Sequence, residues 1–396
     1  MRTGATLQIE ALAGAASIPA AEWNALASRG FHLHRWFIAA EEGGWKARHL
    51  AVRGSDGLRA VVPAYLEGTT LFGDLHDRWF GPLRHVFARA GLRLRPTLAV
   101  VLPPGAASRP LGELDALPDS TVHEAFELLE EQALRDGAKA VVWPFLTERD
   151  SRLLFIGAAR GYRVVFTGSA AVLDTPWASF DEYLADRSKQ VRRTVRRELK
   201  QLAASDLRVS TEMDLRPLAA TLDVFYRHAF RERNGRDPVL HPTFFPALAG
   251  GDSGAIWAQC TWQGTRLVGM SIDACAGGEM DGSLGGFAGA LRGTAAYTNS
   301  LIYLPVRIAA ARGASEIHLG ATSLYPKLLR GARLEPRFTL VRGCSPAARG
   351  QLALLARAFA ARTRRKEARQ LDSLLGAELV AAHLAAVRSV PPTRRE

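Results

Sequence analysis

The densest group of side chains able to do chemistry lies in residues 183–202, YLADRSKQVRRTVRRELKQL. Val191, Val195 and Leu199 recur there at helical spacing, which predicts an amphipathic helix. Its other faces carry cations interrupted by one acid, Glu198, and the cations are Lys189, Arg192, Arg193, Arg196, Arg197 and Lys200. Because like charges at this spacing repel one another, the helix predicts an anionic partner, with a solvated charged face as the alternative.

Other spacings that mark known catalytic centres are missing from the sequence. Cys260, Cys275 and Cys344 match neither a disulfide framework nor zinc-ligand spacing, and we expect them to be buried and inert. We find no Ser/His/Asp or Cys/His signature and no Walker-type phosphate loop. The sequence therefore predicts no metal site and gives no sign of a covalent nucleophile.

An internal duplication supplies the elements that would position these residues. Residues 49–66 and 256–272 each predict a hairpin with a glycine turn. Residues 122–145 and 300–321 then each predict a helix, a glycine stop and a short strand. The repeated pattern therefore predicts two copies of one α/β (or α+β) unit, each of them a mixed sheet flanked by helices.

The duplication also suggests a division into domains. A chain of 396 residues accommodates two domains of roughly 100 to 200 residues each. We predict an N-terminal lobe over residues 1–174 and a C-terminal lobe over residues 175–345, which includes the basic helix. An Ala/Leu/Arg-rich helical tail follows over residues 346–396, where it would serve packing or an interface.

Composition indicates a folded, cytoplasmic protein. Hydrophobic residues make up 47% and charged residues 23% of the chain, as in ordinary globular proteins. No apolar stretch reaches the roughly 18 residues of a membrane span, and Glu10 lies where a signal peptide needs an apolar core. The net charge of +12 would attract tRNA, CoA or anionic lipid, although a GC-rich genome also produces such an arginine excess.

Several short motifs then occur in the order that a known family shows. SKQVRRTVRRELKQL is followed by Phe225-Tyr226, PVLHPTFF at 238–245, QGTRLVGMSI and the KLLRG of 327–331. With IPAAEWNAL at 18–26, the chain resembles the FemAB-like and BioF2-like acyltransferases of the GNAT superfamily, including peptidoglycan biosynthesis or recognition proteins. The resemblance implies tandem GNAT-like lobes, a non-catalytic first lobe and an active site in the second.

Three positions depart from the FemAB-like pattern. Gly293-Thr294 stand where the family typically has an aromatic-acidic pair, and His318 stands where it has an acidic residue. Leu324-Tyr325 replace a glutamate-histidine pair. The resemblance therefore leaves the substrate and the general base open.

GNAT-type chemistry, which the resemblance implies, is direct attack of an amine on a thioester or ester. The donor would be acyl-CoA, with aminoacyl-tRNA as a second candidate. Its pyrophosphate is expected at the turn of residues 286–300, which leads into a helix. We predict a donor site formed by Arg292, Gly293, Thr294, Lys327, Arg330 and Gly331. A plain glycine-rich turn beside surface charges is the alternative.

The proton acceptor is expected in the second lobe. Its candidates are His318, Tyr297, Asp273 and Tyr325, with His318 first because histidine titrates near neutrality. A hydrogen-bonded core histidine is the alternative.

These expectations favour an N-acyltransferase that acts on an amine of a cell-envelope precursor or a secondary metabolite. The basic helix would bind the substrate or the donor through Lys189, Arg192, Arg193, Arg196 and Arg197. A non-catalytic protein that binds tRNA or an anionic glycopolymer is the alternative function. A third possible function is that of a peripheral membrane protein that contacts the membrane surface through this helix.

Overall fold

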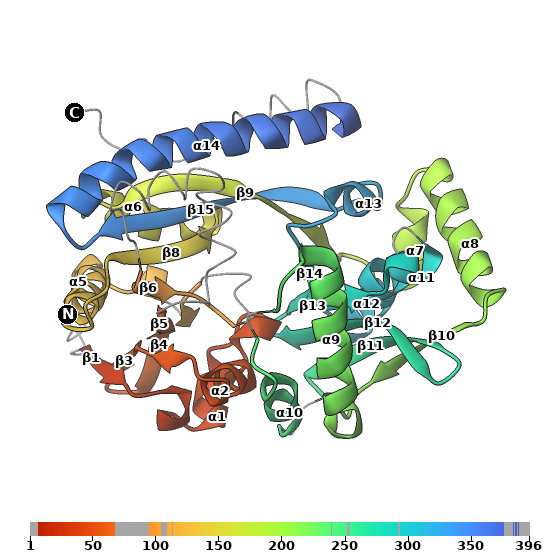
Figure 1. Ribbon diagram of the computed structural model, residues 1–396, viewed down its shortest axis with the longest axis horizontal. Helices are drawn as coiled ribbons and strands as arrows, with labels where there is room; N and C mark the ends of the chain where they lie inside the picture. The colour runs from red at the N-terminus through yellow and green to blue at the C-terminus, as the bar shows by residue number, and fades with distance from the viewer. Residues whose placement is uncertain are drawn as a thin grey trace. The chain divides into compact units, whose positions relative to one another are not determined.

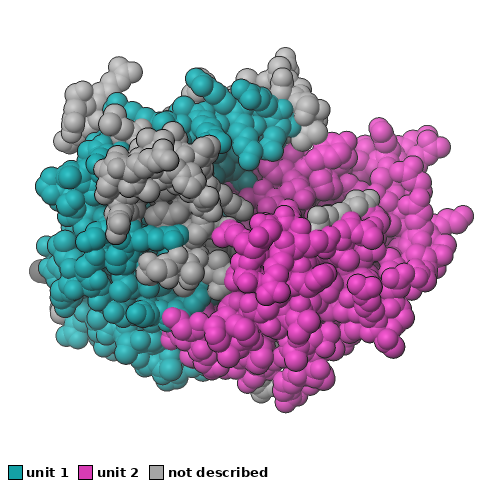
Figure 2. Space-filling model, in the orientation of Figure 1, with its two compact units in different colours: residues 1–26, 45–169, 336–396 teal, residues 27–44, 170–335 magenta. Residues whose placement is uncertain are grey.

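The computed structural model describes residues 7–67, 95–103, 109–112, 114–238, 240–251, 254–291, 294–375, 383, 385 and 387. The chain forms two compact units (Figures 1 and 2). The first unit contains residues 1–26, 45–169 and 336–396, and the second contains residues 27–44 and 170–335. The predicted division at residues 174 and 345 stays a prediction.

The first unit is built on two sheets. One has the order β1-β3-β4-β7, and the other has the order β9-β15-β8-β6-β5-β2, in which β6 and β8 are parallel. Its strands are β1 (Gln8–Leu12), β2 (Lys46–Ala47), β3 (His49–Gly54), β4 (Gly57–Val62), β5 (Ala64–Glu67), β6 (Thr97–Val100), β7 (Leu111–Gly112) and β8 (Ala140–Leu146), with parts of β9 (Arg163–Asp174) and β15 (Arg333–Gly343). Its helices are α1 (Ala20–Ala25), α5 (Asp119–Arg135), α6 (Ser151–Ala159) and α14 (Pro346–Leu375).

The core of the first unit lies where α5 and α6 cover a sheet. Val122, Phe126 and Leu129 recur at helical spacing along α5 and are all buried. Phe126 stacks on Trp143 of β8 with ring centroids 4.5 Å apart. This packing fixes the helices by apolar contact, and it includes none of the predicted site residues.

The second unit is built on one sheet of order β10-β11-β12-β13-β14-β9. Only β13 and β14 are parallel neighbours. Its strands are β10 (Leu207–Glu212), β11 (Ile256–Gln263), β12 (Arg266–Ala276), β13 (Glu279–Phe287) and β14 (Glu316–Gly320), with the ends of β9 and β15. Its helical segments are η2 (Gly30–His32), α2 (His34–Glu42), α7 (Phe180–Ala185), α8 (Lys189–Ala203), α9 (Ala219–Asn234), α10 (Phe244–Ala249), α11 (Ala295–Thr298), the π-helix η7 (Asn299–Tyr303), α12 (Leu304–Arg312) and α13 (Leu324–Leu328).

Helices cover both faces of this sheet (Figure 1). On one face, Met280 and Ile317 pack with side chains of α7, α8 and α12, among them Tyr183, Val195 and Val306. On the other face lie α9 and η2, with α2 and α10 beside them. The sheet thus separates two environments, and each holds one polar cluster of the candidate site.

Most predicted elements are confirmed. The hairpins appear as β3-β4 and β11-β12. The predicted helix stops are Gly137 and Gly313, with φ of 69° and 64°, a conformation that glycine adopts without a steric penalty. The tail is helical over α14. The mixed α/β architecture predicted for each copy is therefore correct.

The single helix predicted over residues 183–202 is wrong, because the segment forms two helices, α7 and α8. The hydroxyl of Ser188 accepts a hydrogen bond from the amide of Val191 and caps α8. Side chains at helical spacing continue across this break, so periodicity alone could not reveal it. Separately, no helix in the described part of the chain is long and apolar enough to cross a bilayer.

Candidate functional site

The site begins where β13 and β14 part. These strands pair in parallel for three residues only, with Glu279 opposite Glu316 and Asp281 opposite His318. Beyond this point β13 continues to Phe287 beside β12, whereas β14 continues to Gly320 beside β9. Backbone groups along a ladder that stops in this way can bind an extended ligand. We call this feature the β13-β14 fork.

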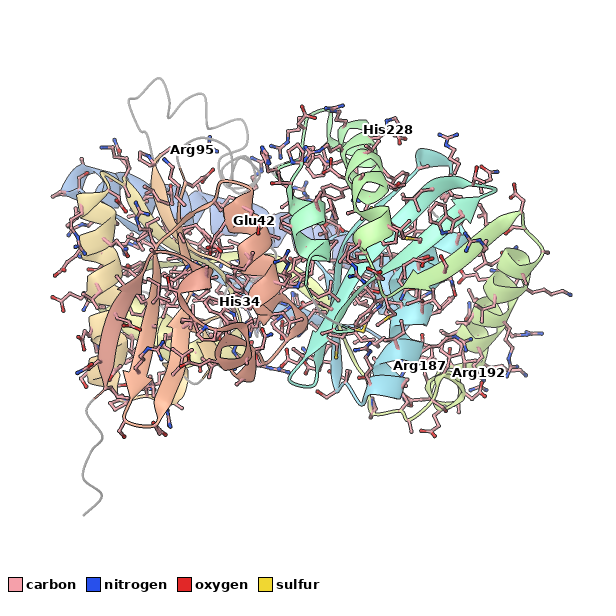
Figure 3. All side chains as sticks on the ribbon, turned by 90° about the horizontal axis from the view of Figure 1, so that it is seen from below. His34, Glu42, Arg95, Arg187, Arg192 and His228 are labelled. Carbon is pink, nitrogen blue, oxygen red and sulfur yellow. The ribbon has the colours of Figure 1, made fainter. Side chains whose placement is uncertain are left out.

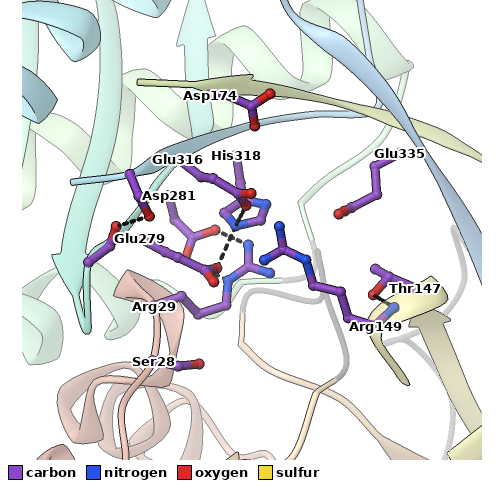
Figure 4. A network of polar contacts seen from close by, with 12 residues as sticks. Ser28, Arg29, Thr147, Arg149, Asp174, Glu279, Asp281, Glu316, His318 and Glu335 are labelled. Atoms are coloured by element: carbon purple, nitrogen blue, oxygen red, sulfur yellow. Dashed lines mark hydrogen bonds and ion pairs between the residues drawn. The ribbon is translucent and has the colours of Figure 1, made fainter. Parts of the chain in front are cut away.

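A polar cluster lies on the η2 face of the sheet at the base of the fork. Side chains alternate between the faces of a strand, so Met280 and Ile317 point into the apolar core on the opposite face. Figure 4 shows the polar set together, and we call it the His318 cluster: Arg29, Glu279, Asp281, Glu316 and His318. Arg29 immediately precedes η2, Glu279 and Asp281 lie on β13, and Glu316 and His318 lie on β14.

Arg29 and Asp281 form a buried ion pair within the His318 cluster. The Arg29 Nε donates to Asp281 Oδ2 at 3.0 Å, and the amide of Phe31 donates to the same oxygen at 2.8 Å. Burial by itself lowers the pKa of Arg29. The charge of Asp281 and its hydrogen bonds have the larger effect, so the pKa of Arg29 is raised above its ordinary value. Gly30 lies so close to the Ala274 carbonyl oxygen that a Cβ would approach it to 2.2 Å. The pair therefore fixes η2 against β12 and β13.

His318 is paired with a carboxylate. Its Nε2 lies 2.8 Å from Glu279 Oε2 and 4.0 Å from Glu316 Oε2. The donor atoms of Glu279, Glu316 and His318 lie within 4.8 Å of one another, close enough to hold a metal ion. However, Arg333 Nη2 lies 3.0 Å from Glu316 Oε1, and its charge would repel a cation. The arrangement suits a histidine oriented by a carboxylate, and the absence of a metal stays a prediction.

A second polar cluster surrounds Asp273 on the opposite face. Trp257 is opposite Asp273 and Gln259 opposite Ser271 in the β11-β12 ladder. The Ser271 hydroxyl donates to Asp273 Oδ1 at 2.9 Å, and Thr211 donates to Gln259 at 2.7 Å. The Trp257 and Gln259 N–H groups lie near Asp273 without forming well-directed hydrogen bonds.

Complete burial raises the pKa of Asp273 to about 7, although Ser271, Gln259 and Trp257 act in the opposite direction. A carboxyl group that titrates near neutrality is suited to proton transfer. Thr261, on the same face, lies 3.2 Å from the hydroxyl of Ser300 in η7. π-Helical turns are frequent at functional sites.

The predicted donor loop is only partly described. Arg292 and Gly293 lie outside the described residues. The Thr294 hydroxyl donates to the Leu291 carbonyl oxygen at 2.6 Å, directly before α11. From there α11, η7 and α12 follow one another without interruption. The assignment of a donor to this loop stays a prediction.

The predicted donor residues after β14 make internal contacts. Lys327 Nζ donates to three carbonyl oxygens, those of Leu319, Gly320 and Thr322. Burial lowers its pKa to about 7. Gly331 has φ of 94°, and a Cβ there would collide with the Arg187 guanidinium. These contacts give the two residues structural roles, and their donor role stays a prediction.

Arg330 anchors the basic helix. Its Nη2 donates to both carboxylate oxygens of Glu198 at 2.7 and 2.9 Å, and its Nε donates to the Tyr303 hydroxyl at 3.0 Å. One nitrogen therefore contacts both carboxylate oxygens, and hydrogen bonds between charged groups are stronger than those between neutral groups. Glu198 is the one acid of the basic run, and it faces inward to meet Arg330.

The remaining predicted residues lie apart from the His318 cluster. The Tyr297 ring packs edge-on against Phe287 with centroids 5.0 Å apart. Tyr325 is half exposed. Arg192 donates to the carbonyl oxygens of Ala185 and Arg187, whereas the other four predicted basic residues, Lys189, Arg193, Arg196 and Arg197, are exposed.

Sequence reasoning proposed His318 and Asp273 as candidate site residues but did not predict their partners. Glu279 and Asp281 alternate along one strand, as do Glu316 and His318 along another, and this period of two was available as a signal. Arg29 lies 252 residues before Asp281, and no local pattern connects them.

Comparisons with known proteins identify the family. A family model for FemAB-like proteins, described as peptidoglycan biosynthesis/recognition, matches residues 14–374. The chain is similar to the crystal structure of FemX, with 12% identity and a TM-score of 0.57 over 86% of this chain and 98% of FemX. It is also similar to the C-terminal domain of a protein from Agrobacterium fabrum described as a lysylphosphatidylglycerol synthetase, with 12% identity and a TM-score of 0.50 over 82% and 91% of the two chains. No curated protein matches the chain.

At 12% identity these structural likenesses concern the fold alone. They agree with the fold predicted from the duplication, mixed sheets flanked by helices, and the tandem GNAT-like character that the resemblance implies stays a prediction. The family model covers most of the sequence, from the first unit through α14. The chain therefore belongs to the FemAB-like family.

Proposed function

We propose that this protein is an N-acyltransferase that works at the β13-β14 fork. The donor is acyl-CoA or aminoacyl-tRNA, and the acceptor is an amine of a cell-envelope precursor or a secondary metabolite. One observation supports this most directly: a histidine paired with a carboxylate, His318 with Glu279, lies at the base of a fork between parallel strands. Family membership supports a role in peptidoglycan chemistry, as the family description states.

The proposed reaction needs proton transfer and no covalent intermediate. The amine nitrogen attacks the acyl carbon, the bond from that carbon to the donor's sulfur or oxygen breaks, and the donor leaves as a thiol or hydroxyl. The attacking nitrogen must lose a proton, which His318 would accept and then return to the departing sulfur or oxygen. Glu279 would hold the imidazole in position and stabilise the imidazolium ion, as carboxylates do beside catalytic histidines. Arg29 and Asp281 would hold the neighbouring backbone in place.

Asp273 is the competing base. Its pKa of about 7 suits the role, but its side chain is fully buried. A base must come within hydrogen-bonding reach of the proton that it takes. His318 is also buried, but it lies at the base of the β13-β14 fork, where the acceptor amine is proposed to bind. Asp273→Asn and His318→Gln therefore separate the two assignments.

The first test is thermal stability of the purified protein with CoA, acetyl-CoA, longer acyl-CoAs, and charged or uncharged tRNA. A ligand at 100 times its Kd stabilises the native state by about 2.7 kcal/mol, so the true donor should raise Tm clearly. Arg292→Ala should abolish the rise if the predicted donor loop is correct. With the donor identified, His318→Gln should lower kcat by about 10² to 10⁴ without lowering Tm.

The outcomes distinguish the proposed functions. A Tm rise with a donor and full activity in His318→Gln would reject His318 as the base and leave Asp273. The alternative function, a non-catalytic protein that binds tRNA or an anionic glycopolymer, is favoured by the exposed basic residues of α8. It predicts stabilisation by the polyanion, no turnover, and no effect of His318→Gln on binding.

A further inference from the structure

β10 is an open edge of the sheet in the second unit. It lies first in the strand order, and among the described residues β11 is the one strand that pairs with it. It follows α8 in the chain, and Arg192 marks the beginning of that helix in Figure 3. A strand with one neighbour uses only half of its backbone N–H and C=O groups, and the other half point away from the sheet. Such an edge can pair with a further strand.

Two opposite charges lie on one face of this edge. Side chains alternate along a strand, so Arg208, Ser210 and Glu212 share a face. The Arg208 guanidinium lies 5.5 Å from the centroid of the Trp262 ring, whose Nε1 donates to the Ser210 hydroxyl at 3.0 Å. Arg208 and Glu212 are about 13 Å apart along the strand, too far to bind each other. Within the described part of the chain, neither takes part in a salt bridge.

We propose that β10 pairs with β10 of a second copy of this chain, antiparallel about a two-fold axis at Ser210. An axis that relates two antiparallel edge strands is perpendicular to the sheet, so opposite residues lie on the same face. The register at Ser210 sets Arg208 opposite Glu212 of the partner subunit, and Glu212 opposite Arg208 of the partner subunit. Opposite Cβ atoms are about 5 Å apart, so two ion pairs form. An axis one residue to either side leaves both charges unpaired.

The remaining side chains also suit this register. Val209 lies opposite Thr211 of the partner subunit, and β-branched side chains pack well across neighbouring strands. Met213 follows β10 directly and is 44% exposed. It lies opposite Leu207 of the partner subunit, so the pairing covers apolar surface at both ends of the strand.

β10 lacks the usual protection of an edge strand. Natural edges avoid pairing through proline, lysine or a bulge, whereas β10 contains no proline or lysine and pairs with β11 in continuous register. After the strand, Asp214 faces Asp206 of the partner subunit, but Arg216 binds Asp214 and offsets its charge. The self-complementary charges favour a second copy over an unrelated chain.

The dimer is expected to be weak. Residues 208–212 supply about four to six backbone hydrogen bonds between the two strands, which makes a small interface. Two chains of net charge +12 also repel each other, although about 150 mM salt screens this repulsion beyond about 8 Å. We expect a Kd of about 10 to 100 µM. The inference is separate from acyl transfer and does not depend on it.

The test is sedimentation equilibrium of the full chain between about 5 and 300 µM. Arg208→Glu and Glu212→Arg should each raise the Kd about tenfold or more, because each sets like charges opposite one another twice in the dimer. The double variant, Arg208→Glu with Glu212→Arg, exchanges the charges and should restore the Kd to within about threefold of the wild type. The control is Arg357→Glu at an exposed position of α14, which should keep the wild-type Kd.

Hydrogen exchange on the wild type gives a second measurement that needs no variant. The amides of residues 207–212 that point away from β11 should gain protection as the concentration rises over the same range. Tm verifies that each variant is folded. The proposal is overturned by a monomer at every concentration, by a dimer that Arg208→Glu leaves intact, or by a dimer without new protection in β10. Failure of the double variant to restore the dimer would reject the register at Ser210.

Discussion

Asp273 is a carboxyl group enclosed by the second unit, and its protonation is linked to folding. Burial raises its pKa from an ordinary value near 3.8 to about 7. Between these two pH values the folded chain holds a proton that the unfolded chain releases. The free energy of unfolding therefore falls as pH rises from about 4 to about 7, and this contribution is constant above that.

Asp273→Asn should remove this pH dependence, because the amide is neutral at every pH. We expect the variant to be more stable than the wild type at pH 8, by on the order of 4 kcal/mol, and the difference to shrink towards pH 5. Urea unfolding at pH 5, 6, 7 and 8 measures it. The control is Asp206→Asn at an exposed position, which should keep the wild-type profile. An unchanged profile in Asp273→Asn would show that the carboxyl titrates normally.

At this scale, the sequence supports a prediction only where one residue type carries the information, and the catalytic roles of His318 and Asp273 stay predictions. His318 and Asp273 were recognisable because few side chains titrate near neutrality or become able to when buried. The sequence could not show that Lys327 bonds to three backbone carbonyls, because these are brought to it by the loop after β14. For the same reason, the sequence could not show that Arg29 forms an ion pair with Asp281.

At the scale of elements, α8 depends on one internal ion pair. Its apolar side packs on the unit, but its exposed side carries like charges that repel. Glu198 binds Arg330, which in turn contacts Tyr303 of η7, and the side chains of Glu198 and Arg330 are only 16% and 8% exposed. The pair joins a helix on the surface to the π-helix beside the Asp273 cluster.

Glu198→Gln should therefore destabilise the protein by about 3 kcal/mol, since removing one partner of a buried pair leaves the other charge unpaired. Urea unfolding gives the free energy, and hydrogen exchange should show the amides of α8 losing protection first. The exposed Glu131→Gln in α5 should change stability by less than about 0.5 kcal/mol. A similarly small effect of Glu198→Gln would mean that apolar packing alone holds α8.

Periodicity predicted most elements, because each helix or hairpin is encoded by a short segment. The duplication was visible for the same reason: β3-β4 and β11-β12 are local hairpins. The break between α7 and α8 was missed because a single capping serine, Ser188, decides it. Likewise, the β13-β14 fork joins strands separated by α11, η7 and α12, and a parallel register of this kind leaves no local pattern.

At the scale of the whole molecule, the second unit is not one continuous piece of the sequence. Residues 27–44 belong to it, together with residues 170–335. They supply Arg29 for Asp281 and the buried ring of Trp36, which contacts Phe244 of α10. Removing this segment would leave the buried Asp281 without its partner.

A fragment of residues 170–335 should consequently fail to fold cooperatively. Joining residues 27–44 to it through a flexible Gly/Ser linker should restore a sharp thermal transition. The same construction with Arg29→Ala is the control, and it should be less stable by about 3 kcal/mol or more. Circular dichroism and limited proteolysis report the result. Cooperative unfolding of the fragment alone would show that residues 27–44 are dispensable for this unit.

The distance in sequence between Arg29 and Asp281 also bears on how the protein is made. At roughly 5 to 20 residues per second, about 13 to 50 seconds separate the synthesis of these two residues on the ribosome. Throughout that time Phe31, Trp36 and Phe37, which are fully buried in the finished protein, have no completed sheet to pack on. The nascent chain thus exposes an aromatic segment near its beginning until most of the protein has been translated, and chaperones that hold growing chains should bind it there.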